Sequence, residues 1–218
     1  MIRPFGMNEF WFIVMAAQWT IALSAVAFGG GAVGGLLIAL ARTSKLPAFR
    51  YAALVFIRIF QGTPLLMQLF LVFFGLNIFG IGVNPWVAAA AALTLHASAF
   101  LGEIWRGCIE AVPSGQPEAA WALGLGYRDT MVSIVLPQAA RIAVAPTVGF
   151  LVQLIKGTSL ASIIGFVELT RAGQIINNAT FAPLTVFSVV AALYFILCWP
   201  LSMFARSLEL RFASETRR

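Results

Sequence analysis

Residues Ser114 to Pro146 read SGQPEAAWALGLGYRDTMVSIVLPQAARIAVAP and interrupt a chain that is otherwise largely apolar. Ser114 is suited to cap a helix, Pro117 to its first turn, and Glu118 to the positive end of the helix dipole. The alanines that follow favour helix, and Gly124 favours its end. Such a helix is too short to cross a bilayer and too apolar to lie alone in water. We therefore predict a short helix that docks onto another protein.

Three motifs in this chain resemble those of ABC importer permeases, in the branch that carries polar amino acids. The first is similar to the EAA loop of that family and consists of Glu118-Ala119-Ala120, then Gly124, then Leu136-Pro137. The other two resemble further motifs of the branch and are Gln61-Gly62-Thr63-Pro64-Leu65-Leu66 and Lys156-Gly157-Thr158-Ser159-Leu160. The resemblance covers roughly residues 15–210.

The resemblance implies an all-α polytopic membrane protein, a single domain over residues 1–218 with the fold of a type I ABC importer permease. It implies that a coupling helix sits in a groove of an ABC ATPase subunit, formed by Glu118, Ala119, Ala120, Leu123 and Gly124. It also implies a second permease subunit, the same or homologous, and a periplasmic or extracellular binding protein that delivers an amino acid. ATP and Mg²⁺ would act in the ATPase subunits, so this chain is expected to hold no cofactor and to be no enzyme.

Composition supports a membrane protein independently of any resemblance. Hydrophobic residues make up 61% of the chain and charged residues only 10%, whereas a soluble domain carries about 25% charged residues. The net charge of +6 does not indicate nucleic acid, because the charges lie between apolar runs. Cys108 and Cys198 are too few for a disulfide framework, and a single histidine predicts no metal site. A GxxxxGK[ST] loop is absent, and no nucleophile with a matching base is visible.

Five apolar segments are predicted to cross the bilayer, at about 18–41, 53–77, 86–106, 138–158 and 183–205. Residues 107–137 form the predicted coupling loop. The second span is expected to kink or break at Pro64, which cannot donate a backbone hydrogen bond. Gly31 and Gly35 have the spacing of a helix-packing pair, but among so many glycines this spacing is expected by chance.

The basic residues predict which side each loop faces. Of 14 Lys and Arg, only Arg3 and Arg171 fall outside and Lys156 lies at membrane depth. The other eleven fall on the inner side of a five-span topology, and are Arg42, Lys45, Arg50, Arg58, Arg106, Arg128, Arg141, Arg206, Arg211, Arg217 and Arg218. This bias predicts an N-terminus outside and a C-terminus in the cytoplasm, and the resemblance to ABC importer permeases implies that the membrane is the bacterial inner membrane.

Lys156 is the most informative single residue for a substrate route. A cation at bilayer depth is costly and indicates function by default. Lys156, Thr158 and Ser159 therefore line a predicted route for a zwitterion. The alternative is that Lys156 snorkels to the membrane surface or forms a structural ion pair with Glu168, which is itself a candidate route residue. Glu103 is expected to pair locally with Arg106.

Two other polar groups are candidates for the same route. Gln61, Thr63 and Pro64 form one of them, because carbonyls freed by a break are tolerated only against protein or a water-filled cavity. Alternatively, Gln61 and Thr63 cap the kink. His96 and Ser98 form the second group, near the middle of the third span, where a histidine also commonly bonds a neighbouring helix.

Two other classes of function remain open in the sequence. One is a secondary transporter or channel subunit for small polar solutes, although we see no inverted repeat. The other is a membrane-embedded assembly or sensor subunit that transports nothing. The identity of the amino acid, and whether the permease pair is a homodimer or a heterodimer, do not follow from the sequence.

Overall fold

The computed structural model describes residues 4–44 and 46–215, with side chains to residue 210. The charge assignments for Arg3, Lys45, Arg217 and Arg218 lie outside the described residues, as does the side chain of Arg211. No strand occurs in the described ranges, so the all-α prediction is confirmed. The elements in chain order are α1 (Met7–Thr43), α2 (Pro47–Gly62), α3 (Leu65–Phe70), the π-helical turn η1 (Leu71–Gly75), α4 (Leu76–Ile78), α5 (Pro85–Glu110), α6 (Gly115–Ala122), α7 (Tyr127–Thr130), the π-helical turn η2 (Met131–Val135), α8 (Leu136–Gly157), the 3₁₀ turn η3 (Thr158–Ser162), α9 (Leu169–Thr180) and α10 (Pro183–Glu215).

Four helical segments of the described chain are long and apolar enough to cross a membrane, and the bent pair formed by α2 and α3–α4 makes a fifth if it counts as one span. The four are Met7–Thr43, Pro85–Glu110, Tyr127–Ser162 and Pro183–Leu210. Several of these helices exceed the roughly 20 residues that cross a hydrocarbon core. The first begins at Met7 and not near residue 18, because the Glu9 carboxylate accepts the Gly6 N–H at 3.1 Å and starts the helix early.

The second predicted span breaks where its proline predicts. Helix α2 ends at Gly62, α3 begins at Leu65, and the two axes differ by 105°. Pro64 has no N–H to continue the helical ladder, and it disfavours helical geometry at Thr63 before it. The predicted loop 107–137 is shorter than expected, because α5 continues to Glu110 and helix resumes at Tyr127.

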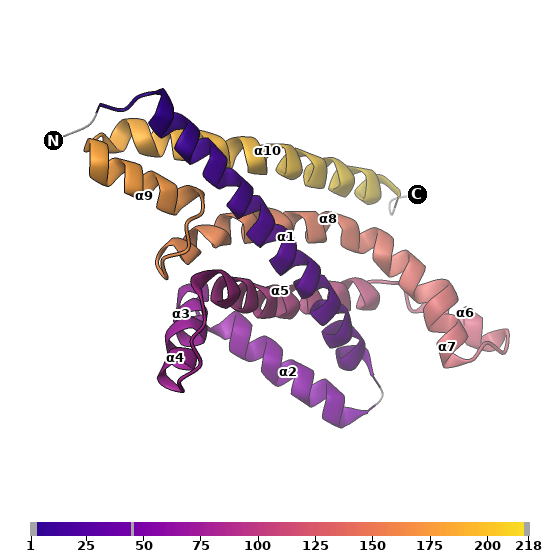
Figure 1. The fold of residues 1–218 in the computed structure, drawn as a ribbon. Coiled ribbons are helices and arrows are strands. Elements are labelled where there is room, and N and C mark those ends of the chain that lie inside the picture. Colours follow the sequence, from indigo (N-terminus) through magenta and orange to yellow (C-terminus); the bar gives the residue numbers. More distant parts are fainter. Residues whose placement is uncertain (1–3, 45, 216–218) are drawn as a thin grey trace.

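The contact between α1 and α5 forms the centre of the molecule, where α1 crosses the other helices obliquely (Figure 1). Glycines of α1 face this contact: a Cβ on Gly31 would lie 2.4 Å from the Ala97 Cβ, and one on Gly34 would lie 2.3 Å from the Ser98 Oγ. Lipid gives helices no hydrophobic reason to associate, so close backbone approach supplies the packing energy. The glycine spacing, which chance alone could explain in the sequence, therefore does form a helix interface.

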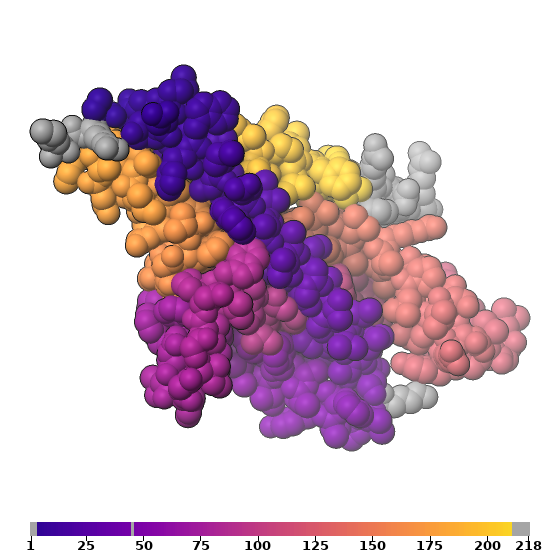
Figure 2. All heavy atoms as spheres, in the orientation of Figure 1, coloured from indigo at the N-terminus to yellow at the C-terminus, as the bar shows by residue number. Residues whose placement is uncertain are grey.

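Different helices lie at the two ends of the molecule. The start of α1 and α9 lie at one end (Figure 1). The carboxyl ends of α1, α5 and α10 point to the other, where the segment α6–α7 projects beyond the helical body (Figure 2). A projecting segment of this kind is accessible to a partner on that side only.

The close packing of α1 on α5 predicts unequal effects of two neighbouring glycine substitutions. Gly31→Ala should lower the free energy of unfolding by about 1–3 kcal/mol, because its Cβ would overlap Ala97. Gly29→Ala is the matched control, since nothing lies within 4 Å of its Cβ and the change in helix propensity is the same. Thermal unfolding of both variants in detergent measures the difference, and equal midpoints would contradict the interface.

Candidate functional site

Two polar interruptions that are far apart in the sequence meet in the fold. The first is the bend between α2 and α3 at Thr63–Pro64, and the second is the change from α8 to the 3₁₀ turn at Gly157–Thr158. A Cβ on Gly157 would lie 3.1 Å from the Leu65 Cδ2, so the start of α3 packs directly against the end of α8. The two sequence motifs that carry the predicted route therefore form one local site.

Gln68 satisfies the backbone groups that the bend sets free. Its Nε2 donates to the Phe60 carbonyl at 2.7 Å, the Thr63 carbonyl at 3.0 Å and the Thr63 hydroxyl at 2.9 Å. The Thr63 hydroxyl in turn donates to the Ile59 carbonyl at 2.7 Å. Thr63 thus caps the kink, which is one of the two roles expected for it. Gln61 is exposed beside it.

His96 is a helix–helix contact of the kind predicted for a lone histidine. Its Nδ1 lies 3.1 Å from the Gln68 Oε1, and its ring lies 4.5 Å from that of Phe100, centroid to centroid. The imidazole therefore contacts the Gln68 amide oxygen, while the amide nitrogen of Gln68 bonds the bend. This arrangement links α5 to the bend without exposing most of the histidine.

Lys156 and Ser159 remain accessible at the second interruption. Lys156 is exposed and forms no salt bridge with the described residues. The half-buried Ser159 donates its hydroxyl to the Lys156 carbonyl at 2.7 Å, which satisfies one end of α8. An ammonium that has no carboxylate partner among the described residues can bind the carboxylate of a ligand.

Ser98 and Thr158 do not present their hydroxyls to an open route. Ser98 donates to the Thr94 carbonyl at 2.8 Å and is buried against Gly34 of α1. Thr158 is fully buried and donates to the Ile155 carbonyl at 2.7 Å. Both hydroxyls satisfy their own helix, as threonine and serine commonly do in membrane helices.

Glu168 is not the partner of Lys156. It is 0% exposed and caps α9, accepting the N–H groups of Thr170 and Arg171, each at 2.8 Å. The Tyr194 hydroxyl of α10 donates to the same carboxylate at 2.9 Å. Burial raises the pKa of the Glu168 carboxyl, and these hydrogen bonds oppose that rise. The ion-pair alternative is therefore wrong, and Glu168 joins α9 to α10.

Helix α6 ends as its glycine predicts. Gly124 has a φ of 79°, and its N–H bonds the Trp121 carbonyl at 3.0 Å. The Leu125 N–H bonds the Ala120 carbonyl at 3.0 Å, which completes a Schellman cap. Ser114 occupies the N-cap position but forms no side-chain cap, contrary to expectation. The capping hydrogen bonds of α6 are therefore at its C-terminal end.

Most side chains of α6 are exposed in the described chain. Leu123 is 83% exposed and Trp121 54% exposed, and Glu118 and Ala119 are also exposed. Ala120 is only 1% exposed and packs inward, so it does not belong to the open side. Exposed large apolar groups gathered on a projecting helix are typical of a protein interface.

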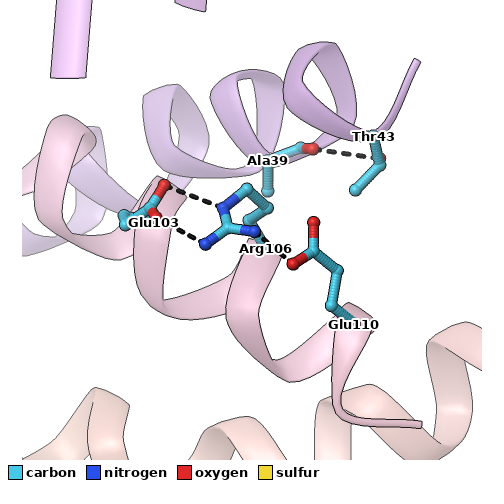
Figure 3. A network of polar contacts seen from close by, with 5 residues as sticks. All are labelled: Ala39, Thr43, Glu103, Arg106 and Glu110. Atoms are coloured by element: carbon cyan, nitrogen blue, oxygen red, sulfur yellow. Dashed lines mark hydrogen bonds and ion pairs between the residues drawn. The ribbon is translucent and has the colours of Figure 1, made fainter. Parts of the chain in front are cut away.

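A charge network lies at the α6–α7 end of α5. Arg106 binds the Glu103 carboxylate through Nε at 2.9 Å and Nη2 at 2.6 Å, and it also pairs with Glu110 (Figure 3). The expected local pair of Glu103 and Arg106 is confirmed. Figure 3 also shows the end of α1 beside this network, where the Thr43 hydroxyl donates to the Ala39 carbonyl at 3.0 Å.

Sequence reasoning missed two residues of the site. Gln68 is an isolated amide in the apolar run after Pro64, and its isolation is a signal that could have found it. Tyr194 sits in the apolar sequence of α10, and only its contact with Glu168 reveals its role.

Residues 31–214 match the model of the binding-protein-dependent transport system inner membrane component family. The chain belongs to this family. It is 37% identical over 208 residues to a probable amino-acid ABC transporter permease of Bacillus subtilis, YckA, covering 95% of this chain and 92% of that protein. It is 35% identical over 201 residues to the glutamine transport system permease GlnP of Escherichia coli K12, covering 91% and 92%.

Two solved structures share the fold of this chain. A crystal structure of an amino acid ABC transporter with histidines matches with a TM-score of 0.87 and 32% identity, covering 92% of this chain and 94% of that chain. An inward-facing MetNI methionine ABC transporter matches with a TM-score of 0.73 at 20% identity, covering 94% and 99%. The second match shows likeness of fold alone.

The hydrogen bonds of Gln68 predict that the bend depends on it. Gln68→Leu should lower the free energy of unfolding by about 1–3 kcal/mol, because the carbonyls of Phe60 and Thr63 lose their donor. Gln61→Leu, at an exposed position just before the bend, is the control and should change stability little. Thermal unfolding in detergent compares them, and equal losses would show that Gln68 does not hold the bend.

Proposed function

We propose that this chain is the permease subunit of an ATP-driven importer for amino acids with polar or charged side chains. The observation that carries the proposal is α6, a capped and exposed helix that projects from a bundle of apolar helices in a chain of this transport family. Relatives named as amino-acid, glutamine and L-cystine permeases support the substrate class. A substrate-binding protein delivers the amino acid, and a second permease subunit, the same or homologous, completes the route.

Coupling to ATP occurs through α6 in this proposal. Glu118, Ala119, Leu123 and Gly124 contact a groove of the ATPase subunit, which binds ATP and Mg²⁺, while Ala120 anchors the helix to its own chain. Helical structure is continuous from Tyr127 to Ser162, which supports transmission of a movement of α6 to the far end of α8. Packed helices have discrete arrangements, so such a movement switches the access of the route.

The substrate route passes the site where the two interruptions meet. The exposed residues Gln61, Thr63, Pro64 and Lys156, with Ser159, line it, and His96 positions Gln68 behind them. The Lys156 ammonium attracts the carboxylate that every amino acid carries. Ser98, Thr158 and Glu168 are left out of the route, because they are buried in the fold.

The orientation in the inner membrane places α6–α7 in the cytoplasm and α9 outside. The positions of the described arginines support this orientation. Arg42 lies at the end of α1, Arg128 in α7 and Arg206 in the last part of α10, and these parts of the helices lie toward the α6–α7 end. Arg171 lies in α9 at the other end. Cytoplasmic loops carry an excess of basic residues.

Cysteine labelling tests this orientation. In a chain with Cys108→Ser and Cys198→Ser, a cysteine at Ser114 should react with an impermeant maleimide only from the cytoplasmic side. A cysteine at Asn178 should react only from outside, because α9 lies at the opposite end. The two native cysteines are buried, so the chain that retains them should itself react little with the maleimide and serves as a second background. The reverse labelling pattern would refute the orientation and the coupling proposal with it.

Substitution of Lys156 tests the route. Lys156→Met keeps the length of the side chain and removes its charge, so uptake should fall at least tenfold while the complex still assembles. Lys156→Arg, which keeps the charge, should retain a larger share of the activity. Uptake in proteoliposomes measures both, and unchanged uptake in Lys156→Met would exclude the ammonium from substrate binding.

Substitution of Gly124 tests coupling. Gly124→Leu places a side chain at a φ of 79°, which strains the cap by about 1–2 kcal/mol and adds bulk on the side proposed for the ATPase. Membrane levels should stay normal, while ATPase binding and binding-protein-stimulated ATP hydrolysis are lost. Gly82→Leu, at an ordinary φ with nothing within 4 Å, is the control. Normal coupling in Gly124→Leu would show that α6 does not contact the ATPase.

A further inference from the structure

Three adjoining hollows open at the α6–α7 end between α1, α5, α7 and α8. The first, the arginine hollow, measures about 530 Å³ and is lined by residues that include Arg42, Arg50, Glu110, Trp121 and Tyr127. A second hollow of about 490 Å³ shares Thr43 and Tyr127 with it and adds Arg128. The third, the apolar groove, measures about 470 Å³ and shares Ile109 with the first and Leu136 with the second. The three form one continuous depression.

The arginine hollow has few hydrogen-bond acceptors for its guanidinium groups, although the Glu103 and Glu110 carboxylates, which share Arg106, partly balance the charge of Arg42. Arg42, Arg50 and Arg128 form no salt bridge there. Glu110 is the only carboxylate among the lining residues, and it is held by Arg106 (Figure 3). The Arg42 Nε is buried without a hydrogen-bond partner among the described residues. An unpaired guanidinium N–H in a concave site requires an acceptor from elsewhere.

The apolar groove, unlike the arginine hollow, is lined by no charged side chain. Its walls are mostly apolar side chains of α1, α5 and α8, among them Leu36, Ile109 and Val144. Its one hydroxyl, that of Thr147, accepts the Trp105 indole N–H at 2.9 Å. The small residues of α8 leave a groove between these membrane helices that offers mainly hydrocarbon surface.

We propose that this depression binds one anionic phospholipid, with its phosphate between the arginines and one acyl chain in the apolar groove. Guanidinium groups bind phosphate through paired hydrogen bonds, and basic pockets between membrane helices are suited to lipid headgroups. A soluble phosphate would explain the arginines but leave the adjoining groove without an occupant. Trp121 and Pro117 of α6 also line the arginine hollow, so the bound headgroup would contact α6.

Native mass spectrometry of the purified full chain tests the site. Phosphatidylglycerol should bind about fivefold or more tightly than phosphatidylcholine with the same acyl chains. Arg42→Gln and Arg50→Gln should each remove most of this preference; Arg50 is exposed, so its variant should fold normally. Arg206→Gln, an exposed arginine outside the three hollows, is the matched control and should keep it. Ala140→Phe, at an exposed position of the groove, should weaken both lipids together.

Three results would overturn the proposal. Equal affinity for the two lipids, or a preference unaffected by both arginine variants, would exclude a headgroup site. Displacement of phosphatidylglycerol by inorganic phosphate at equal concentration, with no effect of Ala140→Phe, would indicate a soluble anion as the ligand.

Discussion

Absence of side chains along one face of α1 brings its backbone against α5, and the positions of the other helices follow from this contact. Gly31 and Gly34 leave room that Ala97 and Ser98 occupy. Helices in lipid gain no free energy by hiding apolar surface from one another, so an interface of this closeness is what fixes α1 across the bundle. The Ser98 hydroxyl lies in this contact and donates to the Thr94 carbonyl of its own helix, which explains why a polar residue at mid-depth is structural here.

The functional regions lie where the regular helices are interrupted. At the bend after α2 and at the end of α8, backbone carbonyls lose their usual donors, and side chains of Gln68, Thr63 and Ser159 lie against them. Polar groups are thereby concentrated at one place in an apolar body. Before the other end of this helical run, across the turn at Gly124, α6 exposes Leu123. The run from Tyr127 to Ser162 thus joins the turn after α6 to the candidate route.

Features that depend on local backbone chemistry could be predicted from the sequence. The break at Pro64 and the left-handed Gly124 follow from what proline and glycine do to any helix. Features that depend on which face of a helix meets a neighbour could not. Thr158 and Glu168 lie in a polar stretch that suggested exposure, yet both are buried, because helix packing and the capping of α9 consume their oxygens. The methyl group of Ala120 packs against its own chain and is buried, although its motif suggested a partner surface.

The central claim is that ATP hydrolysis in a partner drives amino acids through this chain. Proteoliposomes that contain the permease, its ATPase and its binding protein test it directly, with radiolabelled amino acids outside. We predict uptake that requires ATP on the ATPase side and is unaffected by a protonophore. Uptake driven by a proton gradient without ATP, or ATP hydrolysis without uptake, would contradict the account.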